Sequence, residues 1–198
     1  MNKGEQLPLS TIYVVGGLPR TGKTTVCERL SHDIRIGAME TDHVRRLFCP
    51  TPTSKIGTHS GADIPTVTRK MRPRLESLID SLVTSGTSFA LNGECIDPYM
   101  VSESPYRNHI ASCFMGLNDP DAAFDRIRTI ADPRDWAMQQ TDEALRRILE
   151  KYAQRSRALG ELCMSLELPY IDASTDFAHA QEEAYSALLG DHPHTTIA

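Results

Sequence analysis

The chain has 198 residues, of which 40% are hydrophobic and 24% are charged, and this composition is typical of one well-packed globular domain. Its formal net charge of −5 argues against extended nucleic-acid binding, which usually shows as a basic excess. No apolar run approaches the ~18 residues of a membrane span, and no signal peptide begins the chain, so we expect a cytoplasmic protein with no membrane partner.

A phosphate-binding loop is the strongest motif in the chain. Residues 17–24 read GLPRTGKT and fit G-x-x-x-x-G-K-[ST], between an apolar run at 12–15 that predicts a buried strand and residues 24–30 that predict the start of a helix. In such a turn, inward-pointing N–H groups and the helix dipole bind an anion. We expect Lys23 to reach the β- and γ-phosphates of ATP and the Thr24 hydroxyl to ligate Mg²⁺. The nucleotide-binding residues are therefore expected to be Gly17, Leu18, Pro19, Arg20, Thr21, Gly22, Lys23, Thr24 and Thr25.

Asp42 follows a second short strand, expected over residues 34–39, and precedes a helix over residues 43–48 that Thr41 is expected to cap. In an open parallel sheet, ligands bind outside the carboxyl ends of the strands, so Asp42 falls where chemistry is expected. Two roles stay open for this carboxylate. It either caps the helix beside Thr41, or it orients an acceptor hydroxyl and accepts its proton.

A polar stretch without periodicity, residues 49–63, is typical of a functional or disordered loop. Apolar residues at helical spacing then predict a helix over residues 67–82. Pro73 is expected to kink or split this helix, because proline removes a hydrogen bond and clashes with the preceding turn. Four cations surround the proline, and they are either a solvated face or a place that holds an anionic acceptor: Arg69, Lys70, Arg72 and Arg74.

The second half of the chain alternates strands with helices, which indicates a three-layer α/β domain with a mostly parallel sheet. We see neither an internal repeat nor a second core, so we expect a single domain over residues 1–198. Trp136, the only tryptophan, follows the helix that begins near residue 121. The remaining elements are expected to be strands over 88–91, 110–115 and 169–172, helices over 121–130 and 177–189, and a long amphipathic helix capped by Thr141.

With these motifs in order, the chain resembles the small P-loop kinases: the nucleoside-monophosphate, gluconate, shikimate and chloramphenicol kinases and their uncharacterised bacterial relatives. The segments that carry the resemblance are GLPRTGKT, TDHVRRLF, NGE, DRIR with DPRDW, and LPYIDAS. The resemblance implies a three-layer α/β/α P-loop NTPase fold with a five-stranded parallel sheet in the order 2-3-1-4-5. It also implies an acceptor-binding insertion at about residues 43–86 and an arginine-bearing lid at about residues 126–140.

The chain departs from many P-loop enzymes in one respect, because the third strand does not end in a Walker B aspartate. Asn92, Gly93 and Glu94 stand there instead, and this leaves open which carboxylate holds the water shell of Mg²⁺. Glu94 is one candidate for that role. It is also the rival of Asp42 as the base that accepts the proton of the acceptor.

The resemblance implies an ATP-dependent phosphotransferase that moves the γ-phosphate to a hydroxyl of a small-molecule acceptor, with ATP and Mg²⁺ as cofactors. Phosphoryl transfer depends on positioning and on neutralising charge. Lys23 and Mg²⁺ on Thr24 are expected to neutralise the phosphates. The residues expected to stabilise charge on the transferred group are Arg126, Arg128 or Arg134, and those expected to bind the acceptor are Asp42, Arg45, Arg72 and Glu94.

Two other classes of function stay open. The protein could phosphorylate the 5′ end of a nucleic acid or a nucleotide-sugar, although the acidic net charge argues against the nucleic acid. It could instead be a nucleotide-dependent switch that hydrolyses ATP slowly and acts through a partner. We expect a monomer or a homodimer.

Overall fold

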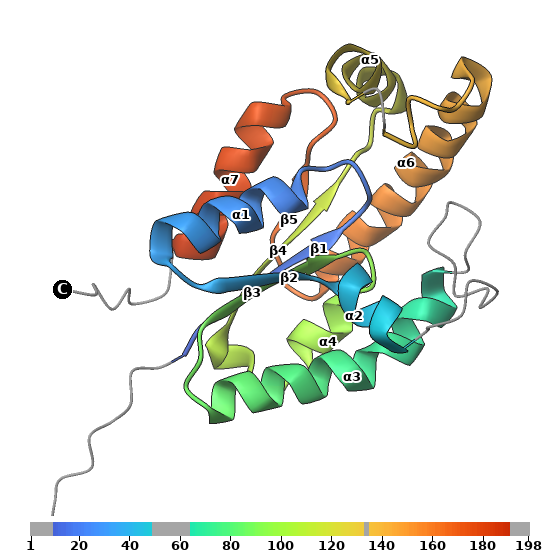
Figure 1. Cartoon of the computed structure of the whole chain (residues 1–198). Coiled ribbons are helices and arrows are strands. Elements are labelled where there is room, and N and C mark those ends of the chain that lie inside the picture. The colour runs from blue at the N-terminus through green and yellow to red at the C-terminus, as the bar shows by residue number, and fades with distance from the viewer. Residues whose placement is uncertain (1–9, 49–63, 133–134, 191–198) are drawn as a thin grey trace, which may run out of the picture.

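A five-stranded parallel sheet forms the middle layer of the computed structural model, which describes residues 10–48, 64–132 and 135–190. Its strand order is β2-β3-β1-β4-β5, and every neighbouring pair runs parallel (Figure 1). This confirms the predicted fold class and sheet order. The strands are β1 (Ile12–Gly17), β2 (Gly37–Glu40), β3 (Phe89–Gly93), β4 (Ile110–Gly116) and β5 (Tyr170–Asp172).

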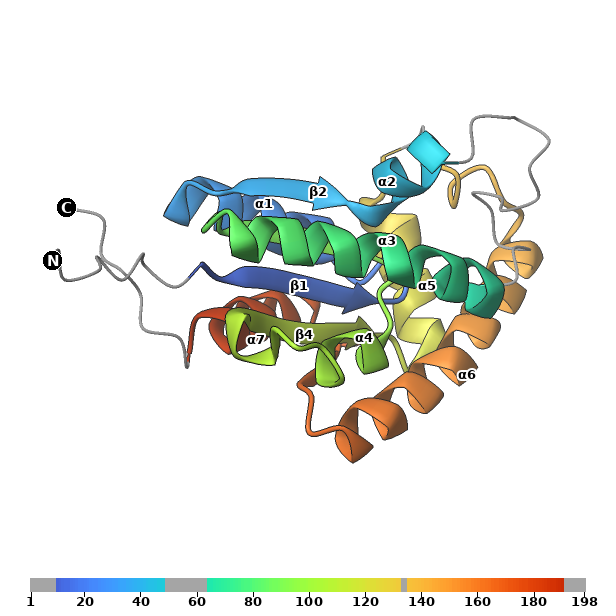
Figure 2. The same ribbon diagram turned by 90° about the horizontal axis from the view of Figure 1, so that it is seen from below.

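Helices form the two outer layers (Figures 1 and 2). The longer helices are α1 (Lys23–Ile34), α2 (Thr41–Phe48), α3 (Ile64–Thr84), α5 (Pro120–Ile130), α6 (Asp142–Ser165) and α7 (Phe177–Leu189). The short helix α4 (Pro98–Ser102) and a 3₁₀ turn (Arg107–His109) are additions to the predicted elements. Among the described residues, no helix combines the length and the hydropathy that crossing a bilayer requires.

The central strand β1 is buried along its whole length because helices cover both faces of the sheet. Ile12 and Val14 pack against α3 and α4, whereas Tyr13 and Val15 pack against α1 and α7. Successive side chains of a strand point to opposite faces of the sheet. Because both faces are covered here, every residue of the strand has to be apolar or small. The phosphate-binding loop therefore begins at the end of a strand that is buried along its whole length.

Two predicted local features, the cap of α2 and the start of the second strand, are wrong. Thr41 does not cap α2 but is its first residue, and no hydrogen-bond partner of its hydroxyl is present among the described residues. Its side chain packs against the bare backbone of Gly93, where an added Cβ would lie 1.8 Å from Thr41 Oγ1. The second strand also begins later than predicted, because Ile34 is the last residue of α1.

The helix around Pro73 is not split, since α3 is continuous through 21 residues with Pro73 inside it. The apolar stripe of this helix explains why it continues. Val67, Met71, Leu75 and Ile79 are all buried against the sheet, on both sides of the proline. Packing over two turns on each side outweighs the one hydrogen bond that the proline removes.

We therefore expect Pro73→Ala to stabilise the protein, because the exposed ring contributes little packing and alanine restores the hydrogen bond to the carbonyl of Arg69. The free energy of unfolding should rise by roughly 1–3 kcal/mol in a urea titration. Pro120→Ala is the matched control, since Pro120 is the first residue of α5, where proline is well tolerated. Equal changes in the two variants would contradict this account of α3.

Candidate active site

The phosphate-binding loop joins β1 to α1 and is fixed by the neighbouring strand. The backbone N–H of Leu18 donates a hydrogen bond of 2.9 Å to the carbonyl of Met115, in β4. Gly17 precedes it with φ +122°, and an added Cβ would lie 2.0 Å from the same carbonyl oxygen. Only glycine fits this approach, and the close contact explains why the loop turns where β1 ends.

Lys23 is buried within this loop, with 8% of its surface exposed. Its ammonium group donates to the carbonyl of Leu18 and lies 3.5 Å from the hydroxyl of Thr21, which itself donates to Leu18 at 2.9 Å. Burial lowers the pKa of Lys23 to about 8, although the nearby carboxylates Glu94, Asp42 and Glu40 act in the opposite direction. In the part of the chain that the structure describes, no carboxylate forms an ion pair with the ammonium group, which is thus placed for an added anion.

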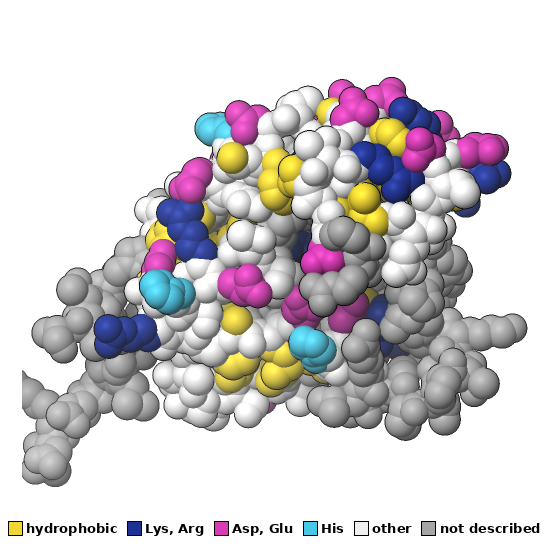
Figure 3. Space-filling model, turned by 45° about the horizontal axis from the view of Figure 1, so that its top comes forward, with side chains coloured by type: hydrophobic (Ala, Val, Ile, Leu, Met, Phe, Trp, Pro, Cys, Tyr) yellow, Lys and Arg dark blue, Asp and Glu magenta, His cyan; other side chains and the backbone are white. Residues whose placement is uncertain are grey.

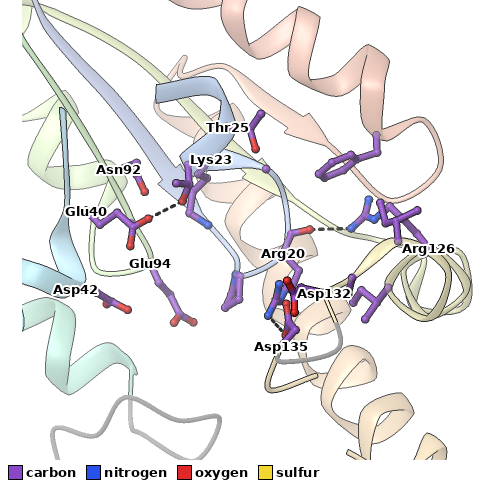
Figure 4. Close-up of a pocket in the computed structure, with 18 residues that line it drawn as sticks. Arg20, Lys23, Thr25, Glu40, Asp42, Asn92, Glu94, Arg126, Asp132 and Asp135 are labelled. Atoms are coloured by element: carbon purple, nitrogen blue, oxygen red, sulfur yellow. Dashed lines mark hydrogen bonds and ion pairs between the residues drawn. The ribbon is translucent and has the colours of Figure 1, made fainter. Parts of the chain in front are cut away.

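Thr24 donates a hydrogen bond of 2.8 Å to Glu40, the last residue of β2 (Figure 4). A hydroxyl and a carboxylate side by side are the hard oxygen donors that Mg²⁺ prefers. Among the described residues, no cluster of three or more His, Cys, Asp or Glu side chains is present that could hold a metal ion. This pair therefore fits an ion bound mainly by phosphates and water, as Mg²⁺ usually is at nucleotides.

The sequence interpretation missed Glu40. The signal was available, because Glu40 and Asp42 place two carboxylates within three residues at the carboxyl end of a strand. Glu40 is the carboxylate that binds the Thr24 hydroxyl, and it therefore joins Glu94 as a candidate for holding the water shell of Mg²⁺.

A cavity of about 490 Å³ lies over the loop and collects charged side chains of both signs. Figure 3 shows Asp and Glu side chains gathered near the middle of one face of the molecule. The cavity is lined by the loop residues Pro19, Arg20, Gly22, Lys23, Thr24 and Thr25; by the carboxylates Glu40, Asp42, Glu94, Asp132 and Asp135; by the apolar Ile127, Ile130, Ala131 and Phe177; and by Arg126. Asn92 and Gly93 complete the lining.

Arg126 reaches this cavity, but its guanidinium group is occupied by backbone carbonyls. It donates to the carbonyl of Arg20 at 2.7 Å and to that of Ala173, and it lies 4.2 Å from the ring centre of Phe177. Burial lowers the pKa of Arg126. With the flat Phe177 ring beside it, this end of the cavity is suited to a nucleotide base. Glu40, Asp42 and Glu94 lie on the other side of Lys23, whereas Asp132 and Asp135 face Arg20 (Figure 4).

Arg128, another of the predicted catalytic arginines, is not brought together with Lys23. Arg128 does not line the cavity, because its guanidinium group binds the carbonyl of Gln140 at 2.7 Å and the carboxylate of Asp142 at 2.8 Å. It thereby ties α5 to the start of α6. Arg134 lies outside the described residues.

The four residues expected at the acceptor are placed differently from one another. Asp42 lines the cavity and forms an ion pair of 3.3 Å with Arg45. Arg45 itself is buried and does not line the cavity. Glu94 lines the same cavity and pairs with Arg155 at 2.7 Å. Arg72 lies further away, in ion pairs of 2.7 Å with Glu76 and Glu103.

A second cavity, of about 510 Å³, begins on the other side of Glu94. Glu94 is the one carboxylate that lines both spaces among the described residues. Both α3 and α6 contribute apolar side chains and arginines to this second cavity. Its lining includes Gly17, Leu18, Ile64, Pro65, Thr68, Arg69, Arg72, Ile96, Asp97, Tyr99, Arg155, Ala158, Leu159 and Leu162.

The burial of Lys23 leads to a prediction about stability. Folding lowers its pKa to about 8, so at pH 7 the buried charge opposes folding by on the order of 3 kcal/mol. The unfolded chain keeps its proton up to about pH 10.4, so stability should rise with pH between 8 and that value. We expect Lys23→Met to raise the melting temperature of the nucleotide-free protein at pH 7, to give a smaller gain near pH 10, and to abolish nucleotide binding.

Lys151→Met is the matched control, because Lys151 is exposed on α6 and should give no gain. A lower melting temperature for Lys23→Met at pH 7 would mean that the hydrogen bonds of the ammonium group outweigh its burial.

Comparisons with known proteins agree with this architecture. No family model and no curated protein matches the sequence. The fold is similar to that of a shikimate kinase from Bacteroides thetaiotaomicron, with a TM-score of 0.56 and 14% identity over 91% of this chain and 97% of that chain. It is also similar to a gluconokinase from Sinorhizobium meliloti 1021, with a TM-score of 0.51 and 14% identity over 92% of this chain and 93% of that one. An uncharacterized protein from Eubacterium ventriosum ATCC 27560 gives 0.52 and 11%, over 91% and 99%. The fold of this chain is thus that of the small P-loop kinases.

Proposed function

We propose that the protein is an ATP-dependent kinase that transfers the γ-phosphate to a hydroxyl group of a small-molecule acceptor. The observation that carries this proposal is the pair of cavities that share Glu94. A nucleotide hydrolase needs only the space over the phosphate-binding loop. A second cavity that meets the first at Glu94 supports a reaction with two substrates.

On the nucleotide side, Lys23 binds the β- and γ-phosphates, and the loop N–H groups surround them. Thr24 and Glu40 are the residues that would hold Mg²⁺. When bound, the ion neutralises charge on the phosphate oxygens. Phe177 and Arg126 hold the base at the far end of the cavity.

On the acceptor side, we assign the base to Asp42, which Arg45 keeps in place. Glu94, fixed by Arg155, orients the acceptor at the junction of the two cavities. A base this close to the attacking hydroxyl accepts its proton as the oxygen bonds to phosphorus. The reverse assignment, with Glu94 as the base, makes a different prediction, which is given below.

The lining of the second cavity favours an amphipathic acceptor. Leu159 and Leu162 of α6 offer it an apolar wall, so a fully hydroxylated compound would leave polar groups without partners there. Arg72 and Arg155 are already paired with carboxylates, whereas no ion pair of Arg69 is present among the described residues. An acceptor with an apolar body and one anionic group would fit these walls.

The proposal is tested by measuring ATP consumption in the presence and absence of a pool of hydroxylated metabolites, nucleosides and aromatic alcohols. We expect consumption to depend on the pool, and the active fraction to yield a phosphorylated product detectable by mass spectrometry. ATP turnover that is the same with and without every acceptor would instead favour a slow nucleotide switch.

Substitutions of Asp42 and of Glu40 should have different effects on the reaction. We expect Asp42→Asn to keep ATP affinity within a few-fold while phosphoryl transfer falls by roughly 10²–10⁴, the usual contribution of a general base. Glu40→Gln should instead raise the Mg²⁺ concentration needed for half-maximal transfer. Glu150→Gln, which removes an exposed carboxylate of α6, is the control and should change neither.

The assignment of the base is then checked with Glu94→Gln. If Glu94 only orients the acceptor, this variant should raise the KM for the acceptor more than it lowers kcat. Loss of kcat in Glu94→Gln together with normal transfer in Asp42→Asn would reverse the two roles.

A further inference from the structure

Arg20 has an unusual backbone for its residue type. It lies in the phosphate-binding loop with φ +68°, a left-handed conformation that residues other than glycine rarely adopt. Arg35 and Glu167, the other such residues among those described, end or follow helices, where this conformation is common. Arg20 instead stands inside a loop, three residues before Lys23. A glycine would adopt this conformation at no cost, so the side chain is expected to have a use.

The guanidinium group of Arg20 lines the nucleotide cavity but is held at its edge. It forms an ion pair with Asp135 and lies 5.6 Å from the ring centre of Trp136. Figure 4 shows Arg20 facing Asp132 and Asp135, on the side of the loop away from Glu40 and Asp42. Its own carbonyl accepts a hydrogen bond of 2.7 Å from Arg126, which fixes the backbone. Among the described residues, Asp135 is the carboxylate that pairs with the side chain.

This arrangement sets Arg20 apart from the other arginines near the site. Arg126 uses its guanidinium group on two backbone carbonyls, and Arg128 does not line the cavity. A partner that is a carboxylate can be exchanged for a phosphate without leaving a buried carbonyl unsatisfied. Among the described residues, Arg20 is thus the cavity arginine best suited to change partners.

A bound triphosphate would force such an exchange. Its phosphates lie on Lys23 and on the N–H groups of the same loop, so they bring several negative charges to the neighbourhood of Asp135. Asp135 is then repelled, while the planar guanidinium group gains a bidentate partner of higher charge. The exchange also separates Arg20 from Trp136, because Trp136 follows Asp135 in the chain.

We propose that Arg20 is a catalytic arginine supplied by the phosphate-binding loop itself, and that Asp135 holds it aside until the γ-phosphate takes its place. This rests on the proposed function only for the transfer step, because the exchange with phosphate can be measured without any acceptor. It assigns to Arg20 the stabilisation of charge that the sequence analysis assigned to Arg126, Arg128 or Arg134.

The test compares two variants by calorimetric titration with AMP-PNP, a non-hydrolysable ATP analogue, and with ADP, in the presence of Mg²⁺ and at low salt. We expect Arg20→Gly to weaken AMP-PNP by roughly tenfold or more and ADP much less, because the lost partner is the γ-phosphate. Asp135→Asn should act in the opposite direction and strengthen AMP-PNP a few-fold, because it removes the competing carboxylate. Asp121→Asn, which breaks the exposed ion pair with Arg146 on α5 and α6, is the matched control and should change neither affinity.

Two further measurements distinguish this role from a merely structural ion pair. Trp136 fluorescence should change when AMP-PNP binds to the natural protein and should stay constant in Arg20→Gly. In the double variant, Asp135→Asn should bring no gain, because its effect acts through Arg20. Weaker AMP-PNP binding in both single variants, or an equal loss for AMP-PNP and ADP in Arg20→Gly, would overturn the proposal.

The outcome is also independent of whether an acceptor is found. If the protein is not a kinase, acceptors will not change its ATP consumption, but Arg20→Gly and Asp135→Asn should still change the affinity for AMP-PNP in opposite directions. Failure of the Arg20 proposal would leave acceptor-dependent transfer intact in Arg20→Gly, whereas we expect transfer there to fall by ~10².

Discussion

The site depends on a cation that is buried without a counter-ion. The ammonium group of Lys23 has only a carbonyl and a hydroxyl of its own loop as partners, and no carboxylate forms an ion pair with it among the described residues. A buried cation in this state is costly unless an anion arrives. The packing of β1 on both faces, and the contact between Leu18 and Met115, supply the rigidity that keeps the loop from relaxing around the charge.

The carboxylates around Lys23 show how the fold prevents them from neutralising it. Glu40, Asp42 and Glu94 all follow the carboxyl ends of neighbouring parallel strands, so the topology places them at one edge of the sheet. Each has a partner of its own: Thr24 for Glu40, Arg45 for Asp42, and Arg155 for Glu94. These partners hold the carboxylates apart, which leaves space at Lys23 for phosphate and gives each carboxylate a distinct neighbour.

Most of the architecture could be predicted from the sequence, because periodicity and the loop motif act locally. The apolar run of β1 and the stripe of α3 identified their elements, and the family resemblance supplied the strand order. What could not be predicted depends on contacts between distant segments. Thr41 is not a cap because Gly93 lies against it, and Arg128 turns away from the cavity because Gln140 and Asp142 bind it. Neither neighbour is visible in the local pattern of the chain.

For the same reason, the role of a residue in one protein of this fold cannot be assigned to another protein from the fold alone. At 14% identity, the likeness to the kinases compared is one of fold, and it does not carry the role of a single residue from one chain to the other. An arginine that reaches the phosphates need not come from the same segment in each protein, since several segments border the cavity. In this chain α5 uses its arginines to fix loops, through the carbonyls of Arg20, Ala173 and Gln140. Among the described residues, the arginine that lines the cavity with a carboxylate rather than carbonyls as its partner is then Arg20, the left-handed residue of the loop.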